Sequence, residues 1–121
     1  MRFIVAALSV ACAALLFAGC SFENKYEREA EKITRAVMAD DLTPVRGDIA
    51  PGIDISRVQV AEWADELDAQ GKLESVKETT PCDPGAHCFN VKFQKHDYHE
   101  ELWMDDQDKV TRWTFHMADA S

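Results

Sequence analysis

The stretch "VTRWTFHM", residues 110–117, decides the fold, because its large apolar side chains recur at every second position. Trp113, Phe115 and Met117 therefore share one side of an extended strand, and polar residues lie between them. The polar link "DDQDK", residues 105–109, joins this strand to the preceding run "EELWM". The sequence thus predicts an antiparallel hairpin near the end of the chain.

Two further strands are predicted before this hairpin. "CFNVKF", residues 88–93, alternates Phe89, Val91 and Phe93 on one side. "KLESVKETT", residues 72–80, has a weaker period of two. Together with the hairpin they predict a meander of about four antiparallel strands.

Residues 21–41 have the spacing of an amphipathic helix instead. Apolar residues recur at steps of four, three and four and define one face, and the opposite face is rich in Glu, Lys and Arg. This buried face consists of Tyr26, Ala30, Ile33 and Val37. The helix is therefore expected to pack against the sheet.

A second helix is predicted to start at Ser56, with Gln59 completing a capping box, and to end at Gly71 in a left-handed conformation. Its buried stripe consists of Val60, Trp63, Ala64 and Leu67. Residues 42–55 between the helices contain two prolines and two glycines, which predicts an irregular segment that still packs through its aliphatic residues. The fold class expected is α+β, with two N-terminal helices packed on a roughly four-stranded antiparallel meander.

The chain begins with the pattern of a secretory signal. Arg2 precedes sixteen uncharged residues, 3–18, a run shorter than the roughly 20 apolar residues that span a bilayer. "LFAGC", residues 16–20, resembles the lipobox of bacterial lipoproteins, which implies cleavage after residue 19 and lipid attachment at Cys20. Ser21 is not the Asp that retains many such lipoproteins at the inner membrane, so the resemblance implies the outer membrane, facing the periplasm. The alternative is ordinary cleavage nearby, which would leave Cys20 as a free or disulfide-paired thiol.

Removal of residues 1–19 from the 121-residue chain leaves a single domain of 102 residues, 20–121. The formal charge of the whole chain is −9, and loss of Arg2 makes it −10. Nucleic acid is an improbable partner for such a surface, because binding to phosphates needs clustered Lys and Arg. A basic protein partner would instead be attracted to it.

Cys82 and Cys88 are the cysteines left for the domain once Cys12 leaves with the signal and Cys20 carries the lipid. An even pair in an oxidising compartment predicts a disulfide, worth about 2 kcal/mol for so small a loop on the chain-entropy model. A metal site would need more ligands, with His87 as the close candidate. A redox pair usually has two intervening residues, whereas five intervene here.

The order of elements resembles the cystatin-like superfamily that includes nuclear transport factor two and ketosteroid isomerase, especially its small bacterial lipoprotein domains of unknown function. The resemblance lies in Trp63, in "GKLESV" and in "ELWMDDQDKVTRWTF". It implies a cone of sheet and helices that can enclose a ligand. Trp63, Trp103 and Trp113 are the candidate ligand-facing aromatics, although aromatics at periodic positions more often fill a core.

"KHDYHEE", residues 95–101, is the densest group of potential ligands and proton carriers. His96 and His99 differ by three positions, which sends them to opposite faces of a strand unless a turn intervenes. We interpret this patch as a solvated hairpin tip and predict neither a metal site nor a catalytic residue. Catalysis of the ketosteroid-isomerase type needs a buried carboxylate base, and none of the acidic residues stands in an evidently apolar setting.

These observations predict an envelope lipoprotein that acts as a non-enzymatic binding or interaction module without a cofactor. It would hold a protein partner through its acidic surface or its open sheet face, for example as an inhibitor or immunity-type protein for a periplasmic hydrolase or toxin. A small-ligand-binding or isomerase-like protein is the first alternative. A structural spacer of the envelope is the second.

Overall fold

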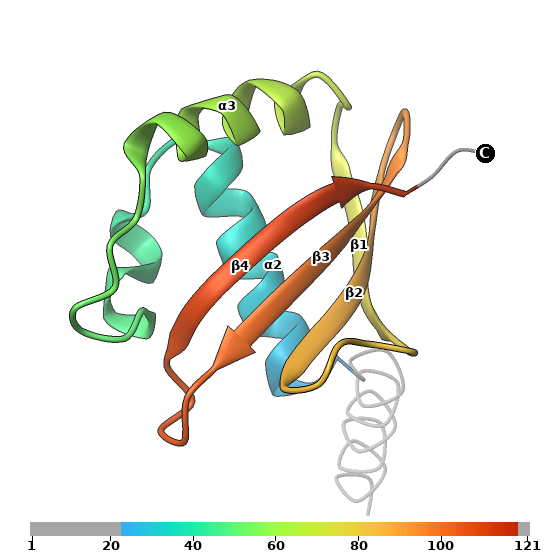
Figure 1. Ribbon diagram of the computed structural model, residues 1–121. Coiled ribbons are helices and arrows are strands. Elements are labelled where there is room, and N and C mark those ends of the chain that lie inside the picture. The colour runs from blue at the N-terminus through green and yellow to red at the C-terminus, as the bar shows by residue number, and fades with distance from the viewer. Residues whose placement is uncertain (1–22, 119–121) are drawn as a thin grey trace, which may run out of the picture.

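The computed structural model describes residues 23–118, so the predicted signal segment and Cys20 lie outside the described residues. Two α-helices and a short 3₁₀ helix precede a four-stranded antiparallel sheet (Figure 1). The strands lie in the order β1-β2-β3-β4, the order of a meander. The α+β class and the antiparallel sheet are therefore as predicted.

Helix α2 spans Lys25–Met38, within the predicted range. Its start is set by a capping box, in which the Asn24 side chain accepts from the backbone N–H of Glu27 and the Glu27 side chain accepts from the backbone N–H of Asn24. Ala30, Ile33 and Val37 are buried as predicted. The second Glu27 oxygen accepts from the backbone N–H of Glu78, 2.7 Å away, and so ties the helix start to the sheet edge.

The connection after α2 forms the 3₁₀ helix η1, Thr43–Asp48, and then an extended segment. Val45 is fully buried, whereas Ile49, Ile53 and Ile55 are only half-buried. Ile49 forms an isolated parallel bridge with Val110. This bridge fixes the irregular segment to the edge of the sheet.

Helix α3 spans Arg57–Asp68. The Ser56 hydroxyl accepts from the backbone N–H of Gln59, which is the first half of the predicted capping box. Val60, Ala64 and Leu67 are buried, and Trp63 is half-buried. Gly71 has φ +87°, the left-handed conformation predicted at the end of this helix.

The four strands are β1 Leu73–Thr79, β2 Ala86–Phe93, β3 Asp97–Met104 and β4 Val110–Met117. The β2–β3 turn is shorter than the predicted hairpin tip, because β3 already begins at Asp97. Asp108 in the last turn has φ +61°, a conformation that more often selects Gly or Asn.

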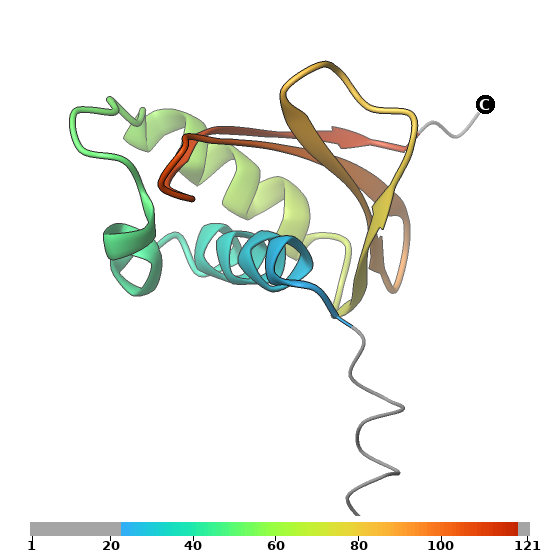
Figure 2. The same ribbon diagram turned by 90° about the horizontal axis from the view of Figure 1, so that it is seen from below.

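Both helices cover the same face of the sheet, and the β1–β2 connection arches away on the other side (Figure 2). The largest side chains without solvent exposure lie between the layers and include Tyr98, Phe89, Phe93, Ile33, Leu67 and Leu102. We call the uncovered side the open face. It carries the alternate side chains of the strands, among them Asn90, His99, Glu101, Trp103, Arg112, Thr114 and His116.

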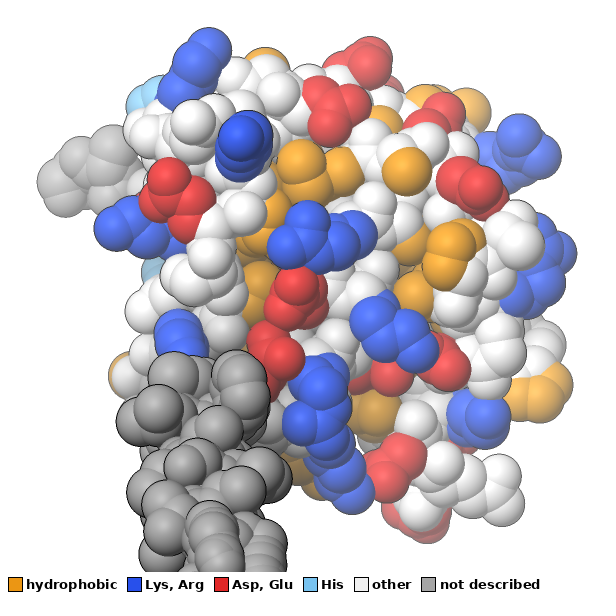
Figure 3. Space-filling view, turned by 180° about the vertical axis from the view of Figure 1, so that it is seen from behind, with side chains coloured by type: hydrophobic (Ala, Val, Ile, Leu, Met, Phe, Trp, Pro, Cys, Tyr) orange, Lys and Arg blue, Asp and Glu red, His pale blue; other side chains and the backbone are white. Residues whose placement is uncertain are grey.

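Seen from behind, the molecule presents Lys and Arg side chains interspersed with Asp and Glu (Figure 3). The acidic excess of the chain is therefore not spread as a uniform negative surface over this side. Among residues 23–118, no helix combines the length and the apolar character needed to cross a membrane.

Candidate functional site

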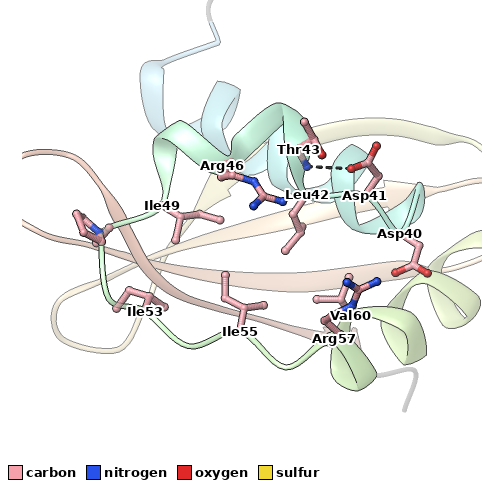
Figure 4. A pocket seen from close by; sticks show the side chains of 12 residues that line it. Asp40, Asp41, Leu42, Thr43, Arg46, Ile49, Ile53, Ile55, Arg57 and Val60 are labelled. Atoms are coloured by element: carbon pink, nitrogen blue, oxygen red, sulfur yellow. Dashed lines mark hydrogen bonds between the residues drawn. The ribbon is translucent and has the colours of Figure 1, made fainter.

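A hollow of about 640 Å³ lies between the segment that follows α2 and the start of α3 (Figure 4). Its lining residues come from the stretch 40–55 that follows α2 and from the first turn of α3. Apolar side chains from both sides build its wall, namely Leu42, Ile49, Ile53, Ile55 and Val60. We call this surface the docking hollow.

Two arginines stand at the docking hollow. Arg46 projects from η1 toward the space between Leu42 and Ile49, and Arg57 lies beside Val60 (Figure 4). Both are exposed, and neither forms an ion pair or a side-chain hydrogen bond with another residue in 23–118. Their guanidinium N–H groups are therefore available to a carboxylate of a binding partner.

Asp40 and Asp41 also line the docking hollow. Asp41 accepts a hydrogen bond from the backbone N–H of Thr43, 3.0 Å away, and contacts with Thr43 lower the pKa of this carboxyl group. Asp40 is exposed and has φ +53°. The hollow thus combines an apolar wall with both signs of charge.

A smaller hollow of about 260 Å³ shares Ile53, Ile55 and Val60 with the docking hollow. Trp63 and Trp113 line it. The indole N–H of Trp113 is buried and has no hydrogen-bond partner among residues 23–118.

The three predicted ligand-facing aromatics do not lie together. Trp63 packs edge-to-face against Phe115, with ring centroids 5.4 Å apart, and borders the smaller hollow together with Trp113. Trp103 lies on the open face, where the Arg112 guanidinium sits 4.5 Å from its ring centroid. The register explains this separation, because Trp113 pairs with Leu102 and so faces the helices, whereas Trp103 is one position further along β3.

The Cys82 and Cys88 sulfur atoms lie 2.04 Å apart, at disulfide distance, with their Cα atoms 5.6 Å apart. The pair closes the loop between β1 and β2 and matches the disulfide predicted from the two cysteines left for the domain. Cys20, the predicted lipid-bearing residue, lies outside the described residues.

Sequence reasoning missed the most unusual carboxyl group of the domain, that of Glu100. This side chain has 0% exposure and lies in the layer between the sheet and α2. The expectation that no acidic residue stands in an apolar setting is therefore wrong. Strict alternation along β3 was the available signal, because Glu100 lies between Tyr98 and Leu102 on the same side of the strand.

The contacts of Glu100 indicate that it carries a proton. The Thr34 hydroxyl has one hydrogen but two oxygen neighbours at 2.8 Å, the backbone oxygen of Ala30 and Oε1 of Glu100. If Thr34 donates to Ala30, a protonated Glu100 can donate to Thr34 in turn, and both contacts are satisfied. Burial raises the pKa of Glu100 well above its ordinary value, in agreement with this chain of hydrogen bonds.

Glu29 on α2 adds a second perturbed carboxyl group near Glu100. Burial and the neighbouring Asp48 carboxylate raise the pKa of Glu29 to about 7. Asp48 is itself held in the ionised form by Lys32, whose Nζ lies 2.7 Å from its carboxylate and lowers its pKa. Neither Glu29 nor Glu100 lines the docking hollow or the smaller hollow.

The turn does separate the two histidines of "KHDYHEE". His96 lies in the turn, with Nδ1 2.7 Å from Oε1 of Gln70, and His99 lies on the open face. Within residues 23–118, no three or more His, Cys, Asp or Glu side chains are grouped so as to hold a metal ion.

Comparisons with protein-family models, curated proteins and solved structures found no match to this chain.

Proposed function

We propose that the protein is a lipid-tethered binding module of the bacterial envelope, anchored through Cys20 and facing the periplasm, that docks a protein partner. The lipobox-like "LFAGC" supports the tether. Each buried methylene contributes about 0.8 kcal/mol, so two or more acyl chains anchor durably. Because α2 begins at Lys25, the domain would stand next to the membrane surface.

The docking hollow is the observation that carries the binding part of the proposal. Its aliphatic wall and its two arginines without ion pairs are accessible to a partner. Val58, which directly follows Arg57, has 68% exposure. Exposed apolar residues rimmed by polar ones mark interaction sites, and Arg is enriched at their energetic centres.

The chemistry of the hollow describes its partner. An apolar side chain of the partner would insert between Leu42 and Ile55, and a nearby carboxylate would face Arg46 and Arg57. The acidic excess of the chain would meanwhile steer a partner with a basic surface. A protective inhibitor or immunity-type protein for a periplasmic toxin or hydrolase fits this description.

A small-ligand carrier, or an isomerase-like protein of the cystatin-like superfamily, is the second candidate. The order of two helices and a meander supports the family resemblance, and about 640 Å³ lies within the usual range of ligand sites. Such sites bury most of their ligand, whereas the charged residues of this hollow are exposed. Protein docking therefore ranks first, and a structural spacer, which has no use for the hollow, ranks last.

Site-specific photocrosslinking in intact cells tests the docking proposal. We expect a photoreactive phenylalanine analogue at Val58 to give one reproducible protein adduct, and the same analogue at Lys92 on the open face to give none. Arg57→Glu should abolish the Val58 adduct by charge repulsion. Equal adducts at both positions, or none at either, would reject the hollow as the docking site.

Two companion measurements separate the alternatives. If the protein is a small-ligand carrier, native mass spectrometry of protein extracted from envelopes would reveal a small co-purified molecule. If the protein is an immunity-type protein, co-expression with a candidate toxin encoded beside this chain would protect the cells. Unchanged killing would exclude the immunity hypothesis.

The anchor is tested by Cys20→Ala, which should move the domain from the membrane fraction to the soluble periplasmic fraction. Persistent membrane association of this variant would contradict lipid attachment at Cys20.

A further inference from the structure

Two of the four histidines have structural partners. His87 stacks on the Tyr26 ring, with centroids 3.9 Å apart, and its Nδ1 lies 3.0 Å from a Glu78 carboxylate oxygen. His96 is hydrogen-bonded to Gln70. The other two, His99 and His116, are exposed and form no hydrogen bond or ion pair with any residue in 23–118.

The two histidines without partners are direct neighbours across strands. His99 on β3 pairs in register with His116 on β4, and both side chains lie on the open face. Residues directly opposite each other in an antiparallel pair have Cβ atoms about 4.5–5.5 Å apart. Two imidazoles at this spacing can each place a nitrogen about 2.0–2.1 Å from one metal ion.

The surroundings of the pair favour a cation. A hollow of about 530 Å³ covers His99 and His116, and the disulfide-closed loop forms its opposite wall. Glu101 and Asp83 line the same hollow and add negative charge. Glu101 is oriented by the Thr114 hydroxyl, which donates to Oε1 at 3.2 Å.

We propose that His99 and His116 form a two-imidazole chelate for a divalent transition metal ion, with water completing the coordination. Imidazole suits copper and zinc, and Cu²⁺ stands highest in the order of affinities for such donors. Because no third His, Cys, Asp or Glu ligand within 23–118 is grouped with the pair, the ion would exchange readily. The proposal does not depend on the docking hollow, which lies elsewhere on the domain.

Isothermal titration of the purified full chain with CuCl₂, and separately with ZnCl₂, tests the chelate. His99→Gln and His116→Gln should each weaken binding of one Cu²⁺ equivalent by at least about tenfold. Even the loss of a residue that only hydrogen-bonds a metal ligand lowers metal affinity about 10- to 100-fold. Zn²⁺ should follow the same pattern with lower affinity. Electron paramagnetic resonance of the copper form should show coupling to two imidazole nitrogens in the wild type.

The matched control is His96→Gln, which removes a histidine from the neighbouring turn and should leave this Cu²⁺ equivalent unchanged. Both test positions are exposed, so the variants should unfold at the same temperature as the wild type without metal. Metal binding elsewhere in the chain is the same in all variants, so the differences in affinity between them report on the substituted histidine alone. Wild-type affinity in either test variant, a loss confined to one of them, or the same loss in the control would overturn the chelate.

Discussion

The two faces of the sheet give neighbouring residues opposite environments, as the burial and contacts of Glu100 and Glu101 show. Glu100 lies under α2 with no exposure, and among residues 23–118 its hydrogen-bond partner is Thr34. Glu101 is half-buried on the open face and accepts from Thr114. One step along β3 therefore separates a buried carboxyl group, whose pKa burial raises well above its ordinary value, from one that lines a polar hollow.

The comparison teaches that core packing and exposed polar side chains are allotted to different faces of the sheet. The helix-covered face holds the large apolar side chains, whose burial is the main favourable term in folding. The open face holds paired polar side chains such as His99 with His116 and Trp103 with Arg112. Substitutions there should change binding chemistry with little change in stability.

Phe89→Ala is expected to have the largest effect. This side chain is fully buried on the helix-covered face, so its loss should lower the free energy of unfolding by about 3–5 kcal/mol. Asn90→Ala, one position along on the open face, should change it by no more than about 0.5 kcal/mol. Urea unfolding followed by tryptophan fluorescence measures both, and similar losses would break the comparison between the faces.

Glu100→Gln should have a smaller net effect whose size depends on pH. Because folding raises the pKa of Glu100, the folded state holds a proton that the unfolded state has released, so wild-type stability falls as pH rises above the ordinary value of 4.5. Gln is neutral and can still donate to Thr34, so the variant should gain stability relative to the wild type as pH rises from 4 to 8.

Thermal unfolding over this pH range measures the gain. The Glu29 carboxyl group, whose pKa is raised to about 7, contributes its own fall in stability between 4.5 and 7 in both proteins. Glu101→Gln is the matched control for the loss of one carboxyl group on β3. A difference between Glu100→Gln and the wild type that stays constant with pH would show that Glu100 is ionised in the folded protein.

Arg112→Ala should have the smallest effect. The guanidinium lies over the Trp103 ring on the open face, and exposed contacts of this kind contribute about 0.5–1 kcal/mol. Differential scanning calorimetry should therefore show a slight decrease in melting temperature. A decrease as large as that of Phe89→Ala would mean that the open face also supports the core.

The repeating patterns predicted most of the fold. A period of two placed Phe89, Val91 and Phe93 on the buried side, and the helical spacing placed Ala30 and Ile33 there. The 3₁₀ helix and the Ile49–Val110 bridge were not predicted. The bridge depends on a contact between segments about sixty residues apart, which no local pattern records.

The candidate sites were predicted less well. The count of cysteines left for the domain indicated Cys82 and Cys88, the pair that lies at disulfide distance. The docking hollow has no local signal, since Arg46 and Arg57 come from different elements. Glu100 follows the alternation of its strand, but its burial was not predicted because a charged side chain was expected to be exposed.

The sequence by itself determined the α+β class, the order of the elements and which cysteines could pair, because periodicity and turn residues act over a few positions. Tertiary structure alone decided that His99 meets His116 and that Glu100 lies beneath Thr34. Both depend on strand register and on where α2 packs. The physical reason is that register and packing are set by the sum of many weak contacts across the whole domain, whereas a local pattern reports only which side of an element a residue occupies.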